Sequence, residues 1–170
     1  EILGRSDLSG TVRMAYVKNL DDFTSREETF IGIVAPTIYD RGILEKIFLI
    51  SQAVEQVQHV DKIRNILTMD YIKGSESGLE VAPMSPDGLV PKDDIQIHEL
   101  KDKADSWDFY KGLFVSGDDT GTLISFTMKE GTQTNDMIPV YYNVKRIVDK
   151  LKGGSEVFIS GVPVVNALMS

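Results

Sequence analysis

The sequence predicts an α+β domain, and three features of its apolar pattern support this prediction. A short run rich in β-branched residues ends at Pro36, two apolar stripes recur at helical spacing, and two β-prone runs flank a turn rich in Gly and Asp. The stripes cover residues 41–58 and 135–152, so strands and helices alternate along the chain. This alternation is typical of a sheet packed against helices.

The first predicted strand covers residues 29–35. It is too short for a helix and too continuously apolar for an exposed strand, so we expect a central strand buried on both faces. Gly32 inside it predicts close packing by a neighbouring residue. Asp40 is expected to cap the following helix. The apolar stripe of that helix consists of Ile43, Leu44, Ile47, Ile50, Val54 and Val57.

The middle of the chain predicts a second strand at residues 60–69 and a short strand at residues 79–81, with a flexible turn at 74–78 between them. Residues 83–93 are rich in proline and form the clearest linker in the chain. Asp93 or Asp94 is expected to cap a helix that ends at about Asp105.

A β-hairpin is predicted further along, where residues 113–116 and 122–128 flank a turn at 117–121. Asp118 and Asp119 lie in this turn. One interpretation of the two carboxylates is a pair of calcium ligands. The spacing of a calcium-binding loop is missing, however, and this favours a plain hairpin turn.

The second long helix, residues 135–152, is predicted to carry Pro139 in its first turn, where a missing N–H costs little. Gly153 and Gly154 are expected to stop it before a last strand at residues 157–159.

These elements define the expected domain organisation. Residues 1–28 form an N-terminal connection, and residues 29–170 form the domain with an insertion at about 71–111. Without the insertion the order is βαββαβ, that of a ferredoxin-like sandwich with two helices on one face of the sheet. A length of 170 residues fits one domain, or two small ones that share a core.

Composition excludes several classes of function. The net charge of −8 argues against a general nucleic-acid binder and against docking on anionic lipids by charge alone. The absence of cysteine excludes disulfides, thiolate zinc sites and cysteine nucleophiles. The sequence contains no run of about 18 apolar residues, the length of a membrane span. Glu1 in place of Met suggests a piece of a longer protein, from which targeting segments would be missing.

No sequence motif for nucleotide binding, a nucleophilic serine or a metalloprotease zinc site is present. His59 and His98 each lie apart from a second histidine or a carboxylate cluster, so neither is expected to bind a metal or to act in catalysis. The residues therefore predict a domain that is not an enzyme and needs no cofactor. The aromatic residues Trp107, Phe109 and Tyr110 are the best candidates for a binding surface, although core packing is the favoured explanation for them.

Five stretches occur in an order that indicates a family. They are Phe30–Val34 with the helix segment Ile43–Ile47, then Val57–Ile63, Leu79–Met84, Leu113–Phe126 and Ile159–Val165. Together they resemble the extracytoplasmic loop of RND-superfamily exporters, in the branch that includes MMPL-type and Patched-like proteins. The resemblance covers about residues 29–170, and His59 stands where that family usually carries Gly.

The resemblance implies a porter-type domain on the periplasmic or extracellular side of an inner-membrane transporter. Such transporters move hydrophobic or amphipathic molecules such as lipids outward, driven by protons that pass through acidic residues of their membrane helices. Those residues would lie outside this chain. The implied partners are the substrate, the rest of the transmembrane polypeptide and further copies of the parent, and nucleic acid is not among them. For the substrate path we expect Tyr39, Met84, Trp107, Phe109 and Tyr110.

Two alternatives stay open. One is a soluble ferredoxin-like module that binds a regulatory ligand, with the Asp118–Asp119 turn or the aromatic cluster as its site. The other is a small enzyme of the same fold, which the lack of cysteine and the scarcity of histidine make the weakest candidate.

Overall fold

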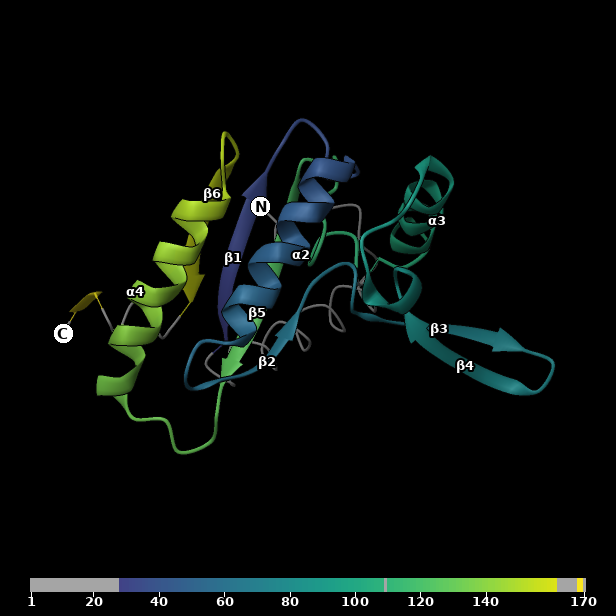
Figure 1. The fold of residues 1–170 in the computed structure, drawn as a ribbon. Coiled ribbons are helices and arrows are strands. Elements are labelled where there is room, and N and C mark those ends of the chain that lie inside the picture. Colours follow the sequence, from purple (N-terminus) through teal and green to yellow (C-terminus); the bar gives the residue numbers. More distant parts are fainter. Residues whose placement is uncertain (1–27, 109, 162–167, 170) are drawn as a thin grey trace.

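The computed structural model describes residues 28–108, 110–161, 168 and 169. Its centre is an antiparallel four-stranded sheet in the order β2-β5-β1-β6, with helices α2 and α4 side by side on one face (Figure 1). The bounds are β1 Thr29–Val34, α2 Arg41–Glu55, β2 Val60–Arg64, β5 Gly121–Met128, α4 Thr134–Leu151 and β6 Glu156–Gly161. The predicted α+β class is therefore confirmed. No helix in the described part of the chain is long and apolar enough to cross a membrane.

Strand β1 is the central strand that its composition predicts. It pairs with β5 on one side and with β6 on the other. Ile31 lies opposite both Ile124 and Ile159; Ile31 and Ile124 belong to the core under the two helices, and the partly buried Ile159 packs against it. Gly32 faces the other side of the sheet, where a Cβ atom would overlap the ring of Phe158. The expected close approach at Gly32 is thus confirmed.

Both long helices form where the apolar periodicity places them. The Oδ2 atom of Asp40 accepts a hydrogen bond from the Ile43 N–H at 3.2 Å, which confirms the predicted cap of α2. Helix α4 begins at Thr134, with a capping box between Gln133 and Asp136. Pro139 therefore lies inside the helix, beyond the first turn in which it was expected. Since proline lacks an N–H, it cannot donate the helical backbone hydrogen bond at that position.

The second predicted strand was too long, because β2 ends at Arg64. Asn65 ends it by folding its side chain onto the backbone. Its Oδ1 atom accepts hydrogen bonds from the N–H groups of Leu67 at 2.8 Å and Thr68 at 3.1 Å, and its Nδ2 atom donates to the Ser51 hydroxyl at 2.8 Å. An asparagine that bonds the backbone in this way favours a turn over a strand.

The predicted hairpin is only half formed. Its turn exists, with the Ser116 N–H bonded to the Gly121 carbonyl at 2.9 Å, and its second arm is β5. The first arm is no strand. It meets the start of β5 at the bridge between Val115 and Thr122, and the Phe114 carbonyl accepts hydrogen bonds from the Leu123 N–H and the Thr122 hydroxyl. From Ser125 onward, β2 pairs with the edge of β5 that β1 leaves open, so a longer first arm would have no edge to pair with.

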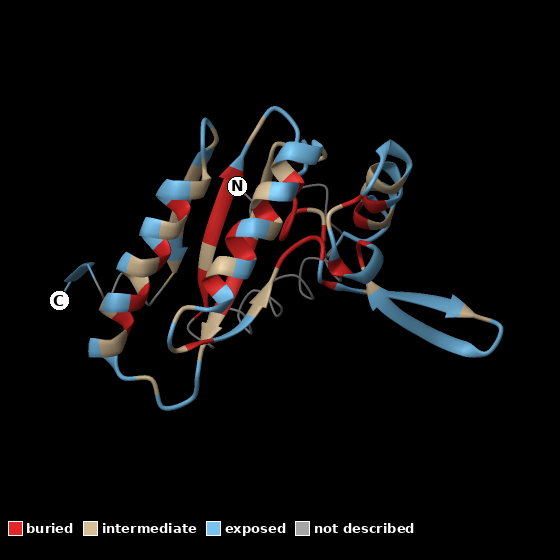
Figure 2. Cartoon of the chain, in the orientation of Figure 1, coloured by how far each residue is buried: buried red, intermediate tan, exposed pale blue. Residues whose placement is uncertain are grey.

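Between β2 and β5 the chain makes an excursion that holds β3 Asp70–Ser75, β4 Gly78–Pro83, the 3₁₀ turn η1 Pro86–Gly88 and α3 Asp94–Asp105. Asp93 caps α3, since its Oδ1 atom accepts from the Gln96 N–H at 2.9 Å. Strands β3 and β4 form a separate hairpin that extends away from the sheet (Figure 1). We call this hairpin, residues 70–83, the arm. Figure 2 shows it almost entirely exposed, whereas the buried residues gather between the sheet and its helices.

Candidate functional site

A pocket of about 140 Å³ opens on the face of the sheet opposite α2 and α4. It lies at the end of β1, where the loop before β5 bends over the strands. We call it the sheet pocket. Its walls are Ile33, Val34, Gly112, Leu113, Phe114, Ser116, Gly121, Thr122, Leu123 and Phe158.

Two glycines and one aromatic ring shape the sheet pocket. Gly32 lets the ring of Phe158 lie against the central strand, and Phe158 remains 47% exposed at the pocket edge. Gly112 has a φ of 104°, a left-handed conformation that favours glycine, and it turns the chain so that Leu113 and Phe114 reach the sheet.

The polar groups of the sheet pocket already have partners. The Ser116 hydroxyl donates to Asp118 at 2.7 Å and accepts from the Gly121 N–H at 2.9 Å. The Thr122 hydroxyl donates to the Phe114 carbonyl at 2.7 Å. No ionisable side chain is among the residues that line it. An apolar group would therefore enter without displacing a hydrogen bond, whereas a charged group would lose its hydration.

The volume limits what fits. Ligand pockets for drug-sized molecules measure roughly 300 Å³ or more, whereas a cavity of about 150 Å³ holds one benzene ring. At about 140 Å³, the sheet pocket takes one ring or a short length of an alkyl chain. It can hold part of a larger apolar molecule while the rest stays outside.

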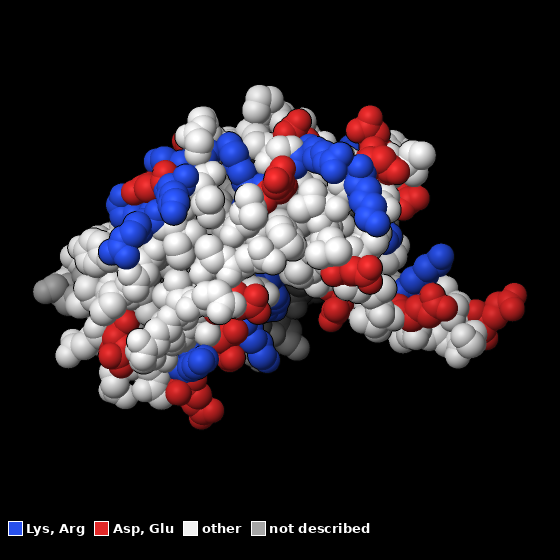
Figure 3. All heavy atoms as spheres, viewed as in Figure 1, with Lys and Arg blue, Asp and Glu red and all other residues white. Residues whose placement is uncertain are grey.

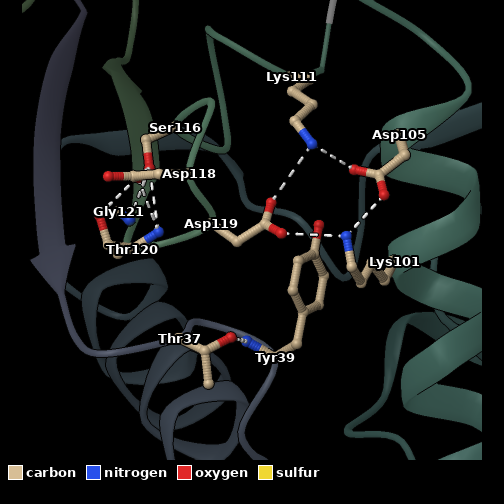
Figure 4. A network of polar contacts seen from close by, with 10 residues as sticks. All are labelled: Thr37, Tyr39, Lys101, Asp105, Lys111, Ser116, Asp118, Asp119, Thr120 and Gly121. Atoms are coloured by element: carbon tan, nitrogen blue, oxygen red, sulfur yellow. Dashed lines mark hydrogen bonds and ion pairs between the residues drawn. The ribbon is translucent and has the colours of Figure 1, made fainter.

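A second cluster, of alternating charges, lies beside α3. We call it the Lys–Asp network. Figure 4 shows Lys101 between Asp105 and Asp119, at 2.6 and 3.0 Å, and Lys111 between the same two carboxylates, at 2.9 and 3.7 Å. The phenol of Tyr39 points toward this network, and the Lys101 ammonium lies 5.4 Å from its ring centroid.

The network perturbs the ionisation of its members. Burial alone would raise the pKa of Asp105, but hydrogen bonds from Lys101 and Lys111 outweigh it and lower that pKa. The hydrogen bonds to Asp105 and Asp119 raise the pKa of Lys101. Burial, followed by the charges of Asp119 and Asp105, raises the pKa of Tyr39. These three shifts move the pKa values of Asp105, Lys101 and Tyr39 further from neutral pH, so none of the three is suited to act as a general acid or base. The ion pairs instead attach α3 to the loops at the end of the sheet.

Asp118 and Asp119 point to different partners. Asp118 accepts hydrogen bonds from the hydroxyls of Thr120 and Ser116 at 2.6 and 2.7 Å, and these lower its pKa to about 2. Asp119 belongs to the Lys–Asp network, with a φ of 63°. The two carboxylates therefore have separate roles, Asp118 in the turn and Asp119 in the Lys–Asp network.

The residues expected on the substrate path do not form one site. Met84 and Tyr110 are buried, with 0% and 3% exposure, and the Tyr110 hydroxyl donates to the Asp70 carbonyl. Trp107, 37% exposed, stacks at 5.7 Å from Tyr110 and at 6.3 Å from Tyr71, which the sequence did not single out. Tyr39 lies at the Lys–Asp network instead, and Phe109 is outside the described residues. None of the four described residues lines the sheet pocket.

The residues that do line the sheet pocket were missed as site residues. Val34, Leu123 and Phe158 come from three different strands and look like ordinary strand residues in the sequence. The one available signal was Gly32, whose expected neighbour is Phe158.

Comparison with known proteins found no family model that matches the chain and no significantly similar curated protein.

Proposed function

We propose that this chain is the extracytoplasmic domain of a proton-driven RND-type exporter of the MMPL/Patched-like branch, and that it shapes the path of hydrophobic or lipid-like substrates. The observation that carries this proposal is the sheet pocket, whose walls are apolar and whose polar groups already have partners. Apolar substrates need such a lining. In this role the domain binds and guides, and it catalyses no reaction.

The arrangement of the elements supports the fold that the proposal requires. We infer a ferredoxin-like sandwich, because β1, α2, β2, β5, α4 and β6 follow one another as βαββαβ with the sheet order β2-β5-β1-β6. A split βαβ unit of this kind is compatible with a porter subdomain. The domain would lie on the periplasmic or extracellular side and contact the rest of its own transmembrane polypeptide.

A position at the wall of a path also agrees with the size of the sheet pocket. A volume of about 140 Å³ holds a ring or chain segment without enclosing a lipid, so the substrate can enter and leave as the wall moves. Two such domains would form a cleft between them, and their closure would push the substrate toward an exit.

The decisive experiment uses the complete coding sequence. We expect apolar spans of about 20 residues on both sides of this chain. In cells that express the full protein, Val34→Asp would place a carboxylate among apolar walls and lower the export of a lipophilic dye. Val34→Phe would fill the same space without charge and lower export as well. Ile95→Asp, at a 70% exposed position in the first turn of α3, is the matched control and keeps export unchanged.

Polar flanks on both sides would overturn the exporter and leave the soluble ligand-binding module, for which the same pocket would be the site. If the flanking segments are apolar but both Val34 variants export the dye normally, the chain would still belong to a membrane protein, and the sheet pocket would not lie on the substrate path.

A further inference from the structure

We propose that the arm of one chain docks on a basic face of α2 and α4 in a second copy of the same chain. The basic face consists of Lys46, Lys145, Arg146, Lys150 and Lys152. This inference does not depend on the sheet pocket, since no residue of the arm or of the basic face lines it.

One side of the arm is apolar and uncovered. Ile72 lies directly opposite Val81, and Leu79, two residues before Val81, shares their side. Their exposed fractions are 39%, 60% and 78%. Tyr71 points the other way, toward Trp107, whose ring centroid is 6.3 Å from its own. The apolar side is therefore turned away from α3.

The exposed apolar side of the arm has the properties of a contact surface. An isolated two-stranded hairpin is at best marginally stable in water, and contiguous exposed apolar residues mark contact sites. Within the described chain, the other contacts of the arm lie at its root: η1 contacts β4, Trp107 lies beside Tyr71, and the Tyr110 hydroxyl donates to the Asp70 carbonyl. Its outer half thus exposes to water an apolar surface that a bound partner would cover.

The charge of the arm selects the partner. Asp70, Glu76 and Glu80 carry three negative charges and Lys73 one positive charge, so the arm has a net charge of −2. Two arms would repel one another, which argues against pairing arm to arm.

The basic face offers the opposite charge on a chain that is acidic overall. Two of its five cations, Lys145 and Lys152, pair with Asp149 at 2.8 and 3.3 Å, and Lys46 on α2 donates to the Ser155 hydroxyl at 2.6 Å, just beyond the end of α4. Figure 3 shows one group of blue atoms over the upper part of α4, further blue atoms over α2 and α3, and mostly red charged atoms along the arm. Exposed apolar surface accompanies the cations, because Tyr142 on α4 is 52% exposed and Leu49 on α2 is 40% exposed.

The two surfaces lie at opposite ends of the molecule (Figure 1). A chain cannot therefore place its own arm on its own basic face. The contact is heterologous, with the arm of one copy on the basic face of the next, and it builds a ring if the rotation closes.

The test is sedimentation velocity on the full chain over a range of concentrations. We expect the wild type to associate at low salt, and we expect association to weaken roughly tenfold in about 0.5 M salt, which screens surface charges. Leu79→Ser with Val81→Ser removes the apolar side of the arm and keeps the chain monomeric. Lys145→Glu with Arg146→Glu reverses the basic face and also keeps it monomeric.

Two controls match these variants. Ile95→Ser removes an equally exposed apolar group elsewhere, and Lys62→Glu with Lys129→Glu makes the same change of charge at exposed positions away from the basic face. Both controls should associate as the wild type does. All substituted side chains are exposed, so each variant should melt near the wild-type temperature.

Mixing gives the decisive result. The arm variant retains a basic face and the basic-face variant retains an arm, so a mixture of the two should form dimers although neither associates alone. A mixture that stays monomeric overturns the proposal, as does a wild type that is monomeric at every concentration at low salt. Association of the arm variant with wild-type affinity overturns it too.

Discussion

Replacing Gly32 by alanine should change the sheet pocket while leaving the stability of the fold nearly intact. The added Cβ atom would lie 2.5 Å from the Cε2 atom of Phe158, and closer still to two other ring carbons. Ordinary contact begins at 3.4 Å, so Cε2 must move by 0.9 Å, the difference of these two distances, and the two nearer carbons must move further. The ring is the far end of a half-exposed side chain, so it can move without the backbone.

The energetic terms of Gly32→Ala nearly cancel. Full burial of a phenylalanine is worth about 1.5–3 kcal/mol, and Phe158 is 47% exposed, so its displacement costs about 1 kcal/mol. Alanine in a strand interior gains about 0.5–1 kcal/mol over glycine. We expect a net change in the free energy of unfolding within about 1 kcal/mol.

The affinity for apolar molecules should respond more strongly, because Phe158 is one wall of the sheet pocket. We expect Gly32→Ala to weaken the binding of a small fluorescent apolar probe about tenfold, which corresponds to roughly 1.4 kcal/mol. Urea unfolding and probe titration on the same samples separate the two effects. Phe158→Ala is the control, since it removes the same wall directly. A loss of stability above about 2 kcal/mol, or unchanged probe binding, would refute the reasoning.

Three further outcomes can be measured on the purified chain. Asn65→Ala should lower the free energy of unfolding by roughly 3 kcal/mol, since four hydrogen bonds of a buried side chain are lost. Ser51→Ala, which removes one of them, should cost about 1 kcal/mol in the same urea experiment. Gly161→Ala should cost more than about 2 kcal/mol, because its φ is 129° and a Cβ atom would lie 2.5 Å from the Glu28 carbonyl oxygen; a thermal melt close to that of the wild type would contradict this. The pKa of Asp118 is lowered from 3.8 to about 2, so its contribution to stability is present above pH 3.8 and is lost as the pH falls toward 2. In Asp118→Asn, the urea midpoint should therefore change less between these two pH values than it does in the wild type.

The parts of the fold that local chemistry determines could be predicted from the sequence. The caps at Asp40 and Asp93 and the apolar stripe of α2 follow from spacing alone. The end of β2 could not be predicted, because Ile66 and Leu67 are buried like strand residues although they belong to a turn. Periodicity cannot distinguish these two cases. The turn depends on the hydrogen bonds of the Asn65 side chain to the backbone that follows it and to Ser51 on α2.

The candidate site was harder still, because it depends on which strands become neighbours. Val34, Leu123 and Phe158 are far apart in the chain and meet only through the sheet order. Aromatic character led instead to Trp107 and Tyr110, of which Tyr110 supports the core of the excursion.

The excursion connects β2 to β5, and these two strands are paired neighbours in the sheet, as the register of Arg64 with Ser125 shows. Its length is therefore independent of the strand order, since a tight turn could join the same two strands. Shortening or replacement of the arm, whose strands form a sheet of their own, would leave the pairing of the four-stranded sheet unchanged. The sandwich can thus act as a fixed frame on which the arm is an exchangeable module, free to diversify in whatever it recognises.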